Sequence, residues 1–423
     1  MSPKAKNSTV KTLNKIIEWS LYILLFSIPV SKTLIEICAT LAIICWVIKR
    51  ILLGREGLDG LRTDINLPIA VFYFISLLSI FWSTHPNISA SAFVRKLSEY
   101  VILYFIVAEM ACEKRIVRNL IAILAASAFL VCIDGLYQKA IGIDFIRGYS
   151  MFNLKRVTSC FKFPNGLSAW LLMVFFPFAS LAFLYTTKRS SLTGDHKNHL
   201  LPKAINYILV ALILYTLFFT YTRGAFISFA AGLTLFLFLI SGKRFRVVFF
   251  SLAAVIILLI LFLPKELKEP IGLSNIVSYG TSGKHRLRMW ATAWRMFADR
   301  PFTGQGLNTF MANYEAFRGP HEEGIWYAHN CYLQMAAEIG VFGLLSFLWM
   351  IIKTAVVSIK SWRRINDEFL RFAYLGLFCG IMSFLFHSGM ETSLYSLKLV
   401  VLFYFSLGLL MGIKKVGMQN GKV

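Results

Sequence analysis

Long apolar stretches separated by short polar ones make up most of the chain. About 17 consecutive apolar residues are enough to cross a bilayer core of roughly 30 Å as a helix, and in lipid the backbone must satisfy its own hydrogen bonds. The pattern contains about twelve such stretches. They centre near Ile23, Ala42, Ile75, Phe105, Ala126, Met173, Ile213, Leu233, Ile256, Leu344, Phe378 and Phe403. The sequence therefore predicts an all-α polytopic membrane protein with about twelve transmembrane helices.

One long polar segment interrupts this pattern. Residues 265–331 collect charge, tryptophan and glycine between two groups of apolar stretches. We therefore expect three parts: residues 1–264 with the first nine helices and short loops, residues 265–331 as a large outer loop with amphipathic helices, and residues 332–423 with the last three helices.

Composition agrees with a membrane protein, because 57% of the residues are hydrophobic and only 15% are charged. The formal net charge of +23 is dispersed over many short loops. Short loops rich in Lys and Arg stay in the cytoplasm, so the pattern predicts that both termini are cytoplasmic. Charges that form no single stripe also indicate that nucleic acid is not a partner.

Three predicted outer segments are cationic although translocated loops usually lose positive charge: residues 137–165, 220–224 and 265–331. Their charge indicates an anionic ligand at the outer face. The alternative stays open, because long loops translocate largely regardless of charge.

The cysteines give little indication of a disulfide or of a metal site. Of the seven cysteines, Cys160 and Cys331 fall in outer segments, so one disulfide between them is an open question. The sequence has no Cys-x-x-Cys or His/Cys cluster to indicate a metal site, and no Walker loop for a nucleotide. We expect no cofactor, so energy must come from the substrate or from an ion gradient.

Two arginines in the earlier outer segments are candidates for binding phosphate. Arg156 lies among aromatic residues in a stretch suited to a lipid headgroup or a sugar phosphate, although an ordinary interfacial loop has the same pattern. Arg223 follows a turn so short that its guanidinium must lie at the membrane boundary, where a planar fork of donors suits phosphate. A snorkelling arginine is the alternative there.

The stretch from His285 to Asp299 predicts an amphipathic helix lying on an interface. Its apolar stripe recurs at helical spacing in Trp290, Ala293, Trp294 and Phe297. Arg286 borders this stripe because it precedes Trp290 by four positions, while Arg288 points elsewhere. Both arginines and Trp290 are candidates for binding the substrate.

The residues after this helix predict a turn and a second helix. Pro301 ends the first helix, Gly304 and Gly306 give a turn, and Asn308 is expected to cap a short helix that follows. The glycines do not form a phosphate loop, because the Gly-Lys-Ser/Thr of that motif is missing.

His329 and Asn330 precede the tenth predicted span, where a helix N-terminus presents free amide groups. A histidine there can act as a general base towards a sugar hydroxyl, and the alternative is a capping or structural histidine. Glu338 is nine positions further and deeper, so we expect it to make interhelical hydrogen bonds. His387 and Glu391 edge the eleventh span and can line the same cavity.

Taken together, these pieces resemble the O-antigen ligase and polymerase superfamily, over a stretch from about Arg156 to Gly343. The resemblance rests on Thr222-Arg223-Gly224, on Arg286 with Trp290, Asp299, Pro301, Gly304 and Gly306, and on His329-Asn330 with Glu338, Gly340 and Gly343. Phe163-Pro164-Asn165 is similar to a further, weaker signature of that superfamily.

The resemblance implies a metal-independent, inverting glycosyltransferase with a lipid-donor (GT-C-like) membrane architecture. Its donor would be an undecaprenyl-diphosphate-linked glycan, its acceptor lipid A-core, and its place the periplasmic face of the bacterial inner membrane. Arg223 and Arg286 would hold the donor diphosphate, and His329 would deprotonate or orient the acceptor hydroxyl. The remaining substrate-binding candidates are Arg156, Arg288, Trp290, Asn330 and His387.

Alternatives to an O-antigen ligase remain. A polymerase of undecaprenyl-diphosphate-linked repeats would carry the same motifs. Glu99, Glu109 and Asp134 lie near or within helices and leave an ion-coupled or lipid-linked-glycan transporter open, although the two halves show no repeated pattern. The transferase hypothesis makes a spatial prediction, which is that Arg223, Arg286 and His329 converge at the outer boundary of the membrane.

Overall fold

The computed structural model describes residues 3–54, 61–153, 155–187, 196–241, 281–320, 324 and 327–419. Within these ranges the chain is helical, with two isolated β-bridges between residues 143 and 156. The longer helices are α1 (Pro3–Ser27), α2 (Lys32–Leu53), α3 (Asn66–Leu78), α5 (Ser98–Met110), α6 (Lys114–Ile141), α7 (Pro164–Thr187), α8 (His196–Phe219), α9 (Arg223–Ile240), α13 (Thr281–Asp299), α15 (Cys331–Ser361), α16 (Glu368–Ser388) and α17 (Leu397–Gln419). Shorter ones are α4 (Pro86–Ala92), a π-helix η3 (Phe93–Leu97), α14 (Phe310–Phe317), and the 3₁₀ turns η4 (Trp362–Arg364) and η5 (Ser393–Tyr395).

Eleven of the predicted span centres fall inside these helices, and the one near Ile256 lies outside the described residues. In the described part of the chain, six helices are long and apolar enough to cross a membrane. They are Lys114–Ile141, Pro164–Thr187, Arg223–Ile240, Cys331–Arg364, Glu368–Ser388 and Leu397–Met418. The chain is thus a polytopic, all-α membrane protein, while the count of twelve and the lipid-donor architecture stay predictions.

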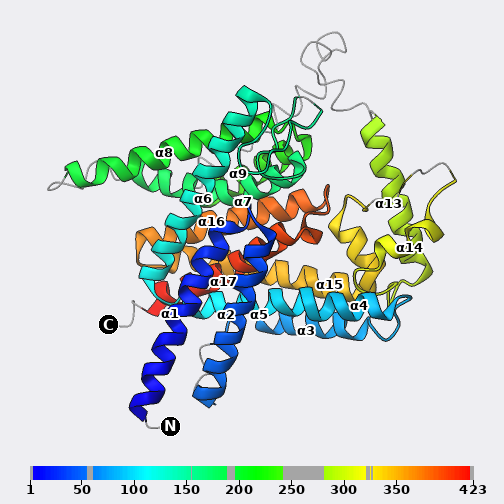
Figure 1. Cartoon of the computed structure of the whole chain (residues 1–423), viewed down its shortest axis with the longest axis horizontal. Helices are drawn as coiled ribbons and strands as arrows, with labels where there is room; N and C mark the ends of the chain where they lie inside the picture. The colour runs from blue at the N-terminus through cyan, green and yellow to red at the C-terminus, as the bar shows by residue number, and fades with distance from the viewer. Residues whose placement is uncertain are drawn as a thin grey trace.

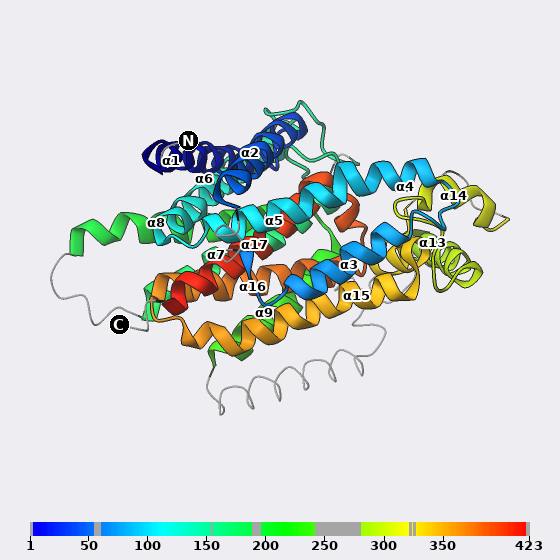
Figure 2. The ribbon, with the colours of Figure 1, turned by 90° about the horizontal axis from the view of Figure 1, so that it is seen from below.

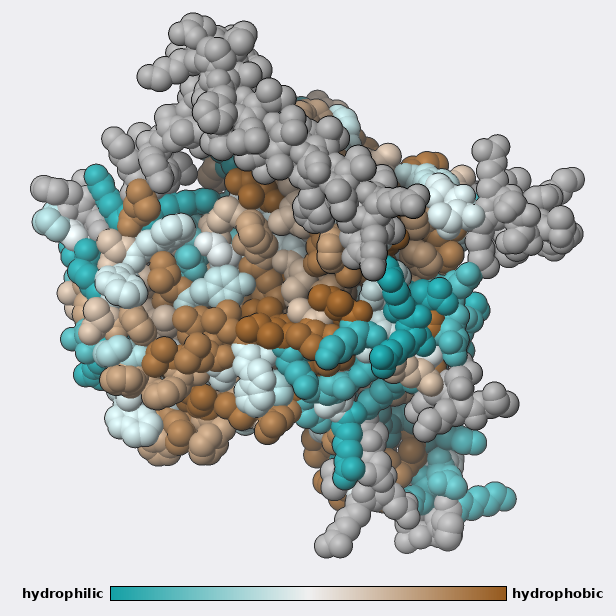
Figure 3. Space-filling view, turned by 180° about the vertical axis from the view of Figure 1, so that it is seen from behind, coloured by the Kyte–Doolittle hydropathy of each residue, from teal (hydrophilic) through white to brown (hydrophobic). Residues whose placement is uncertain are grey.

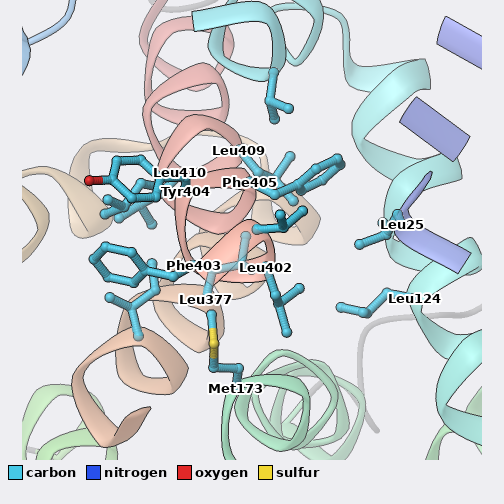
Figure 4. Close-up of a cluster of buried hydrophobic side chains, with 14 of the residues drawn as sticks. Leu25, Leu124, Met173, Leu377, Leu402, Phe403, Tyr404, Phe405, Leu409 and Leu410 are labelled. Carbon is cyan, nitrogen blue, oxygen red and sulfur yellow. The ribbon is translucent and has the colours of Figure 1, made fainter. Parts of the chain in front are cut away.

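A buried core of apolar side chains surrounds α17, which packs on α5 and α16. In Figure 4, Leu402, Phe403 and Phe405 point from α17 to different sides, toward neighbours that include Met173 of α7 and Leu377 of α16. A helix that is apolar on every side is favoured in such a position.

Glycines let two helix pairs approach closely. A Cβ on Gly376 or Gly380 of α16 would lie 2.5 Å from a backbone oxygen of α7, that of Phe176 or Met173. Gly408 of α17 faces the Tyr104 oxygen of α5 at 2.6 Å in the same way. Small residues four positions apart allow this backbone packing in membranes, where lipid gives no hydrophobic drive between helices.

The surface has a broad apolar area and polar regions. Brown side chains cover a broad area on the left and in the middle of the face in Figure 3, and teal ones gather at its left edge and on its right. Exposed apolar side chains such as Ile133, Ile227 and Ile352 belong to helices that are long and apolar enough to cross a membrane, where lipid would cover them.

Opposite ends of the bundle are fixed by different polar contacts. At one end, the buried Lys398 amine donates to the carbonyl oxygens of Pro29 and Cys160, which ties α17 to the α1–α2 turn and the α6–α7 loop. At the other end, Lys114 pairs with Asp367 and Lys414 with Asp64. The second end contains the loops that the charge pattern assigns to the cytoplasm.

Helices α13 and α14 form a small unit beside the start of α15 (Figures 1 and 2). The buried face of α13 is made by Met289, Ala293 and Met296, which pack with Phe310 and Tyr314 of α14. Trp294 of the predicted stripe is 57% exposed instead. Helix α13 therefore has two apolar faces, one packed against the protein and one available to an interface.

The turn after α13 is fastened to a kink in α15. Gln305 N donates to Ala337 O at 2.9 Å, and Gly306 N donates to Glu338 O at 2.7 Å. Gly340 has φ 68°, and a Cβ on it would lie 2.1 Å from Phe302 O, so only glycine fits. We call residues 301–306 with residues 337–341 the glycine joint.

Glu338 completes this joint. Its carboxylate accepts from the backbone N–H of Asn308 at 2.8 Å, from Gln334 Nε2 at 3.1 Å and from the Tyr395 hydroxyl at 3.2 Å. The expected interhelical role of Glu338 is confirmed. The expected cap was wrong: Thr309 is the N-cap of α14, because Asn308 lies in the left-handed region at φ 61° and turns its N–H to Glu338.

Candidate functional site

The buried carboxylate of Glu391 is the centre of the site. Glu391 lies in the connection between α16 and η5, and only 6% of it is exposed. It accepts hydrogen bonds from Asn165 Nδ2 at 2.7 Å, from His329 Nδ1 at 3.0 Å and from Arg286 Nη2. Three segments far apart in the sequence thus meet on one acid. We call Glu391, Arg286, His329, Asn165 and Arg156 the Glu391 network.

Arg156 forms the second layer of this network. Its Nη2 donates to Asn165 Oδ1 at 3.1 Å and to Thr222 Oγ1 at 3.0 Å, and its Nε donates to Thr220 O at 2.7 Å. Burial lowers the pKa of Arg156, and the charge of Glu391 partly offsets that effect. Arg156 therefore connects the α6–α7 loop, the start of α7 and the α8–α9 turn.

Cys331 holds the Glu391 connection in place. Its Sγ donates to Glu391 O at 3.1 Å and accepts from Leu394 N at 3.4 Å. Because Cys331 is the first residue of α15, these bonds fix Glu391 relative to His329, two residues earlier. The acid and the histidine are thus positioned by the same helix start.

The position of the His329 side chain depends on its backbone conformation and on its hydrogen bond to Glu391. The His329 φ of 49° is left-handed, which turns the chain immediately before α15. Because an ionised carboxylate only accepts, the bond to Glu391 assigns the proton to Nδ1 and leaves Nε2 as the nitrogen that can take a proton. The side chain is 27% exposed, so a substrate can reach it.

Arg286 reaches the same carboxylate from the first turns of α13. Its side chain is 29% exposed, compared with 8% for the side chain of Glu391. A partly exposed guanidinium that a carboxylate holds in place has other N–H groups in a fixed planar fork. The geometry is suited to a phosphate oxygen.

The charge state of Glu391 follows from its donors. Burial raises its pKa, but the hydrogen bond from His329 and the positive charge of Arg286 outweigh burial, so the net pKa lies below the ordinary value of 4.5. Glu391 is therefore ionised at neutral pH, as expected for a buried acid with charged donors.

Arg223 is the first residue of α9 and is exposed. The next residue, Gly224, packs against the connection that carries Glu391, since a Cβ on Gly224 would lie 3.6 Å from the Met390 side chain. Thr222, the residue before Arg223, binds Arg156. The structure thus brings Arg286 and His329 onto one acid and places the turn of Arg223 beside them.

The other predicted site residues lie around this network. Asn330 is the N-cap of α15, where its side chain accepts from Tyr332 N and Leu333 N. His387 is fully buried, and its Nδ1 lies 3.3 Å from Ser393 Oγ. Trp290 is half-buried and Arg288 is exposed. Asn330 and His387 therefore have structural partners, and a substrate contact by any of these four residues stays a prediction.

Cys160 and Cys331 do not form a disulfide. All seven cysteines are free. Cys160 Sγ donates to Pro29 O at 3.3 Å, while Cys331 binds the Glu391 connection. Burial raises the pKa of the Cys160 thiol to about 11, so it is protonated at neutral pH. Among the described residues, no group of three or more His, Cys, Asp and Glu side chains is arranged to hold a metal.

Sequence reasoning missed the roles of Glu391 and Asn165. Glu391 lies 62 positions from His329 and 105 from Arg286, so no local spacing connects them. An acid that directly follows an apolar span, next to a buried histidine, is the signal that points to it. For Asn165, directly after Pro164 at the start of α7, the weak Phe163-Pro164-Asn165 signature is the signal, and it does not point to Glu391.

Fold and site define a polytopic membrane protein in which a partly exposed arginine and a partly exposed histidine bind one buried carboxylate at one end of the helix bundle. The matched family is more particular: residues 208–348 match the family model described as O-antigen ligase. That range contains Arg223, Arg286 and His329, and it ends before Glu391. The resemblance to the O-antigen ligase superfamily is confirmed, and its members are glycosyltransferase-like enzymes of polysaccharide biosynthesis.

A curated relative covers more of the chain. The teichuronic acid biosynthesis protein TuaE of Bacillus subtilis (strain 168) is 21% identical over 356 residues, which is 81% of this chain and 70% of the relative. The alignment is consistent with the superfamily.

Proposed function

We propose that the chain is a glycosyltransferase that moves a glycan from a polyprenyl diphosphate, in the first instance undecaprenyl diphosphate, to a sugar hydroxyl. The observation that carries the proposal is the shared contact of Arg286 and His329 with Glu391. It places a cation suited to phosphate and a histidine suited to general-base catalysis on one carboxylate.

The reaction uses these groups in order. Nε2 of His329 takes the proton of the acceptor hydroxyl as its oxygen forms a bond to the anomeric carbon of the donor sugar. The bond between that carbon and the diphosphate oxygen breaks, with inversion, and the electron pair leaves on the diphosphate. Arg286 and Arg223 stabilise the charge that develops on this leaving group.

Glu391 has a positioning role in this scheme. Its negative charge would repel a diphosphate, so Glu391 is not expected to bind the donor. It instead holds the proton on His329 Nδ1 and orients the guanidinium of Arg286. An acid that fixes the tautomer of a histidine makes its other nitrogen an effective base. Arg156 offsets the negative charge from behind.

The arginines supply positive charge directly, and the proposed transfer is therefore metal-independent and needs no cofactor. A polyprenyl diphosphate already contains an activated leaving group, and fixed guanidinium groups can neutralise it.

We propose O-antigen ligase as the particular activity: transfer of O-antigen to lipid A-core at the periplasmic face of the inner membrane. The polymerase of lipid-linked repeats is the second candidate. It is kept because the relative is named for teichuronic acid biosynthesis and not for O-antigen, so that name does not point to a ligase.

Loss of the protein in its host separates the candidates. Bare lipid A-core, with polymer still on undecaprenyl diphosphate, is the result expected for a ligase. Core that carries a single repeat would instead identify a polymerase. Full-length capped lipopolysaccharide would contradict both.

Reconstitution with purified donor and acceptor tests the site directly. Arg286→Gln is expected to lower kcat/KM by about 100-fold or more, because a charged contact to the leaving group is lost. Arg318→Gln, at an exposed arginine of the same outer segment, is the matched control and should not change it. Glycan transport in proteoliposomes that survived both His329→Ala and Arg286→Ala would favour a transporter.

A further inference from the structure

A cavity lies beside η5, the short turn that follows the connection carrying Glu391. It encloses about 100 Å³ between α3, the π-helix η3 with α5, α15, η5 and α17. Aromatic side chains that include Phe72, Tyr100, Phe347 and Tyr404 form its walls. Since a water needs roughly 10–15 Å³ of such space, the cavity has room for a length of alkyl chain.

Two polar groups inside this cavity already have hydrogen-bond partners. Glu338 and Tyr395 both line it, and the Tyr395 hydroxyl donates to the Glu338 carboxylate at 3.2 Å. Glu338 also accepts from the glycine joint and from Gln334. A polar ligand would have to displace these bonds, whereas an alkyl chain would not.

One end of the cavity reaches the surface at a cation. Lys96 is exposed and lines the cavity together with Asn308, and its Nζ lies 3.4 Å from Asn308 Oδ1. Lys96 belongs to η3, a π-helix within the continuous helix that begins at Pro86. Its lining continues to Phe347 of α15 and Tyr404 of α17, two helices that are long and apolar enough to cross a membrane.

The cavity and the Glu391 network share one wall. Leu394 and Tyr395 of η5 line the cavity. Leu394 N donates to Cys331 Sγ, and the same sulfur donates to Glu391 O. A chain in the cavity therefore lies behind the segment that positions His329, while Arg286 and Arg156 are on the network side.

We propose that this cavity binds an acyl chain of the acceptor lipid and that Lys96 pairs with the anionic headgroup of that lipid. The inference rests on the proposed function, in which a donor with its own lipid already occupies the arginines. Transfer between two lipid-linked substrates requires a second lipid site beside the same base. An apolar cavity that ends at an exposed lysine complements an acyl chain with a phosphate-bearing head.

Filling the cavity tests the assignment. Ala92 is buried and lines the cavity, whereas the neighbouring Ser91 is exposed and does not. In the full chain reconstituted with lipid A-core acceptor, Ala92→Leu is expected to raise the KM for the acceptor about 10-fold and to leave the KM for the donor within about twofold. Ser91→Leu should change neither. A higher KM for the donor, or no change for a folded Ala92→Leu protein, would overturn the proposal.

The cation is tested by a second matched pair. Lys96→Gln is expected to raise the KM for the acceptor about fivefold, with a smaller effect at high salt because exposed charges are screened. Arg95→Gln, at the exposed residue next to it, should leave the KM unchanged. Equal effects of the two variants would show that only the net charge of this surface matters and would contradict a site at Lys96.

A binding measurement separates this inference from the proposed function. Lipid A with a photoreactive group in one acyl chain is expected to label peptides of α15 and α17 at the cavity in the wild type, and to label them at least about 10-fold less in Ala92→Leu. If the wild type transfers no glycan but this difference persists, the proposed function fails and the cavity assignment stands. Equal labelling of both proteins would refute the cavity assignment even in an active enzyme.

Discussion

Two buried carboxylates, Glu338 in the glycine joint and Glu391 in the site, show how similar residues serve different purposes. The donors to Glu338 are backbone N–H groups, an amide and a hydroxyl, all neutral. The donors to Glu391 include an arginine and a histidine, which carry or exchange charge. A carboxylate with neutral donors stabilises the fold, whereas a carboxylate with charged donors can orient the side chains that take part in a reaction.

The same contrast extends to the segments around them. The glycine joint is held by backbone hydrogen bonds and by glycines whose positions exclude a side chain. The Glu391 network is held by side chains, and two of them remain more than a quarter exposed. Helix α15 connects both, because it begins beside His329 and kinks at Gly340. The joint thereby sets where α13 carries Arg286.

The largest expected effect comes from His329→Asn. Asparagine tolerates the left-handed backbone at φ 49°, so the fold should remain. It cannot act as a general base, and turnover with purified donor and acceptor should fall about 10²- to 10⁴-fold. Thermal unfolding should be close to that of the wild type. Turnover near the wild-type level would remove the general-base assignment.

Gly340→Ala addresses the joint and should act on stability. The added Cβ would lie 2.1 Å from Phe302 O on a backbone with φ 68°, which costs about 3 kcal/mol through strain and overpacking. The measurement is the thermal unfolding midpoint in detergent. Gly148→Ala is the control, because Gly148 has φ 72° but open space around it, so only strain applies.

Exchanging each acid for its amide compares the two regions directly. Glu391→Gln is expected to lower turnover by about 100-fold, because His329 and Arg286 lose the charge that orients them. Glu338→Gln should instead lower the unfolding temperature, because an amide cannot accept from all of its donors. The comparison fails if Glu338→Gln loses turnover while its stability is unchanged.

The smallest effect concerns pH. The folded-state pKa of Glu391 lies below its ordinary 4.5, because the hydrogen bond from His329 and the charge of Arg286 outweigh burial. Its contribution to stability is therefore present above about pH 4.5 and is lost as the pH falls through the lower folded-state pKa. The unfolding temperature of the wild type should fall more steeply below pH 4.5 than that of Glu391→Gln. Parallel curves would contradict this linkage.

Much of the fold could be predicted from sequence, because hydropathy acts over the length of a single helix. The stretches around Ala126, Met173 and Phe403 lie in helices long enough to cross a membrane. Two other predictions also depended on local sequence and agree with the structure. Helix α13 ends before Pro301, and Glu338 makes hydrogen bonds between helices. The expected cap at Asn308 was wrong, since a positive φ and a distant acid redirect its N–H.

By itself the sequence determined a chain of membrane helices and a cationic polar segment with Arg286 and His329, because both depend on local composition. Only the tertiary structure decided that Glu391 joins them and that Asn165, 226 positions from Glu391, completes the contact. It likewise decided that Cys160 and Cys331 remain apart as free thiols. Such pairings depend on how the helices pack, and packing is set by the steric fit between helix surfaces. The number of positions between two residues in the sequence does not give the distance between them in space.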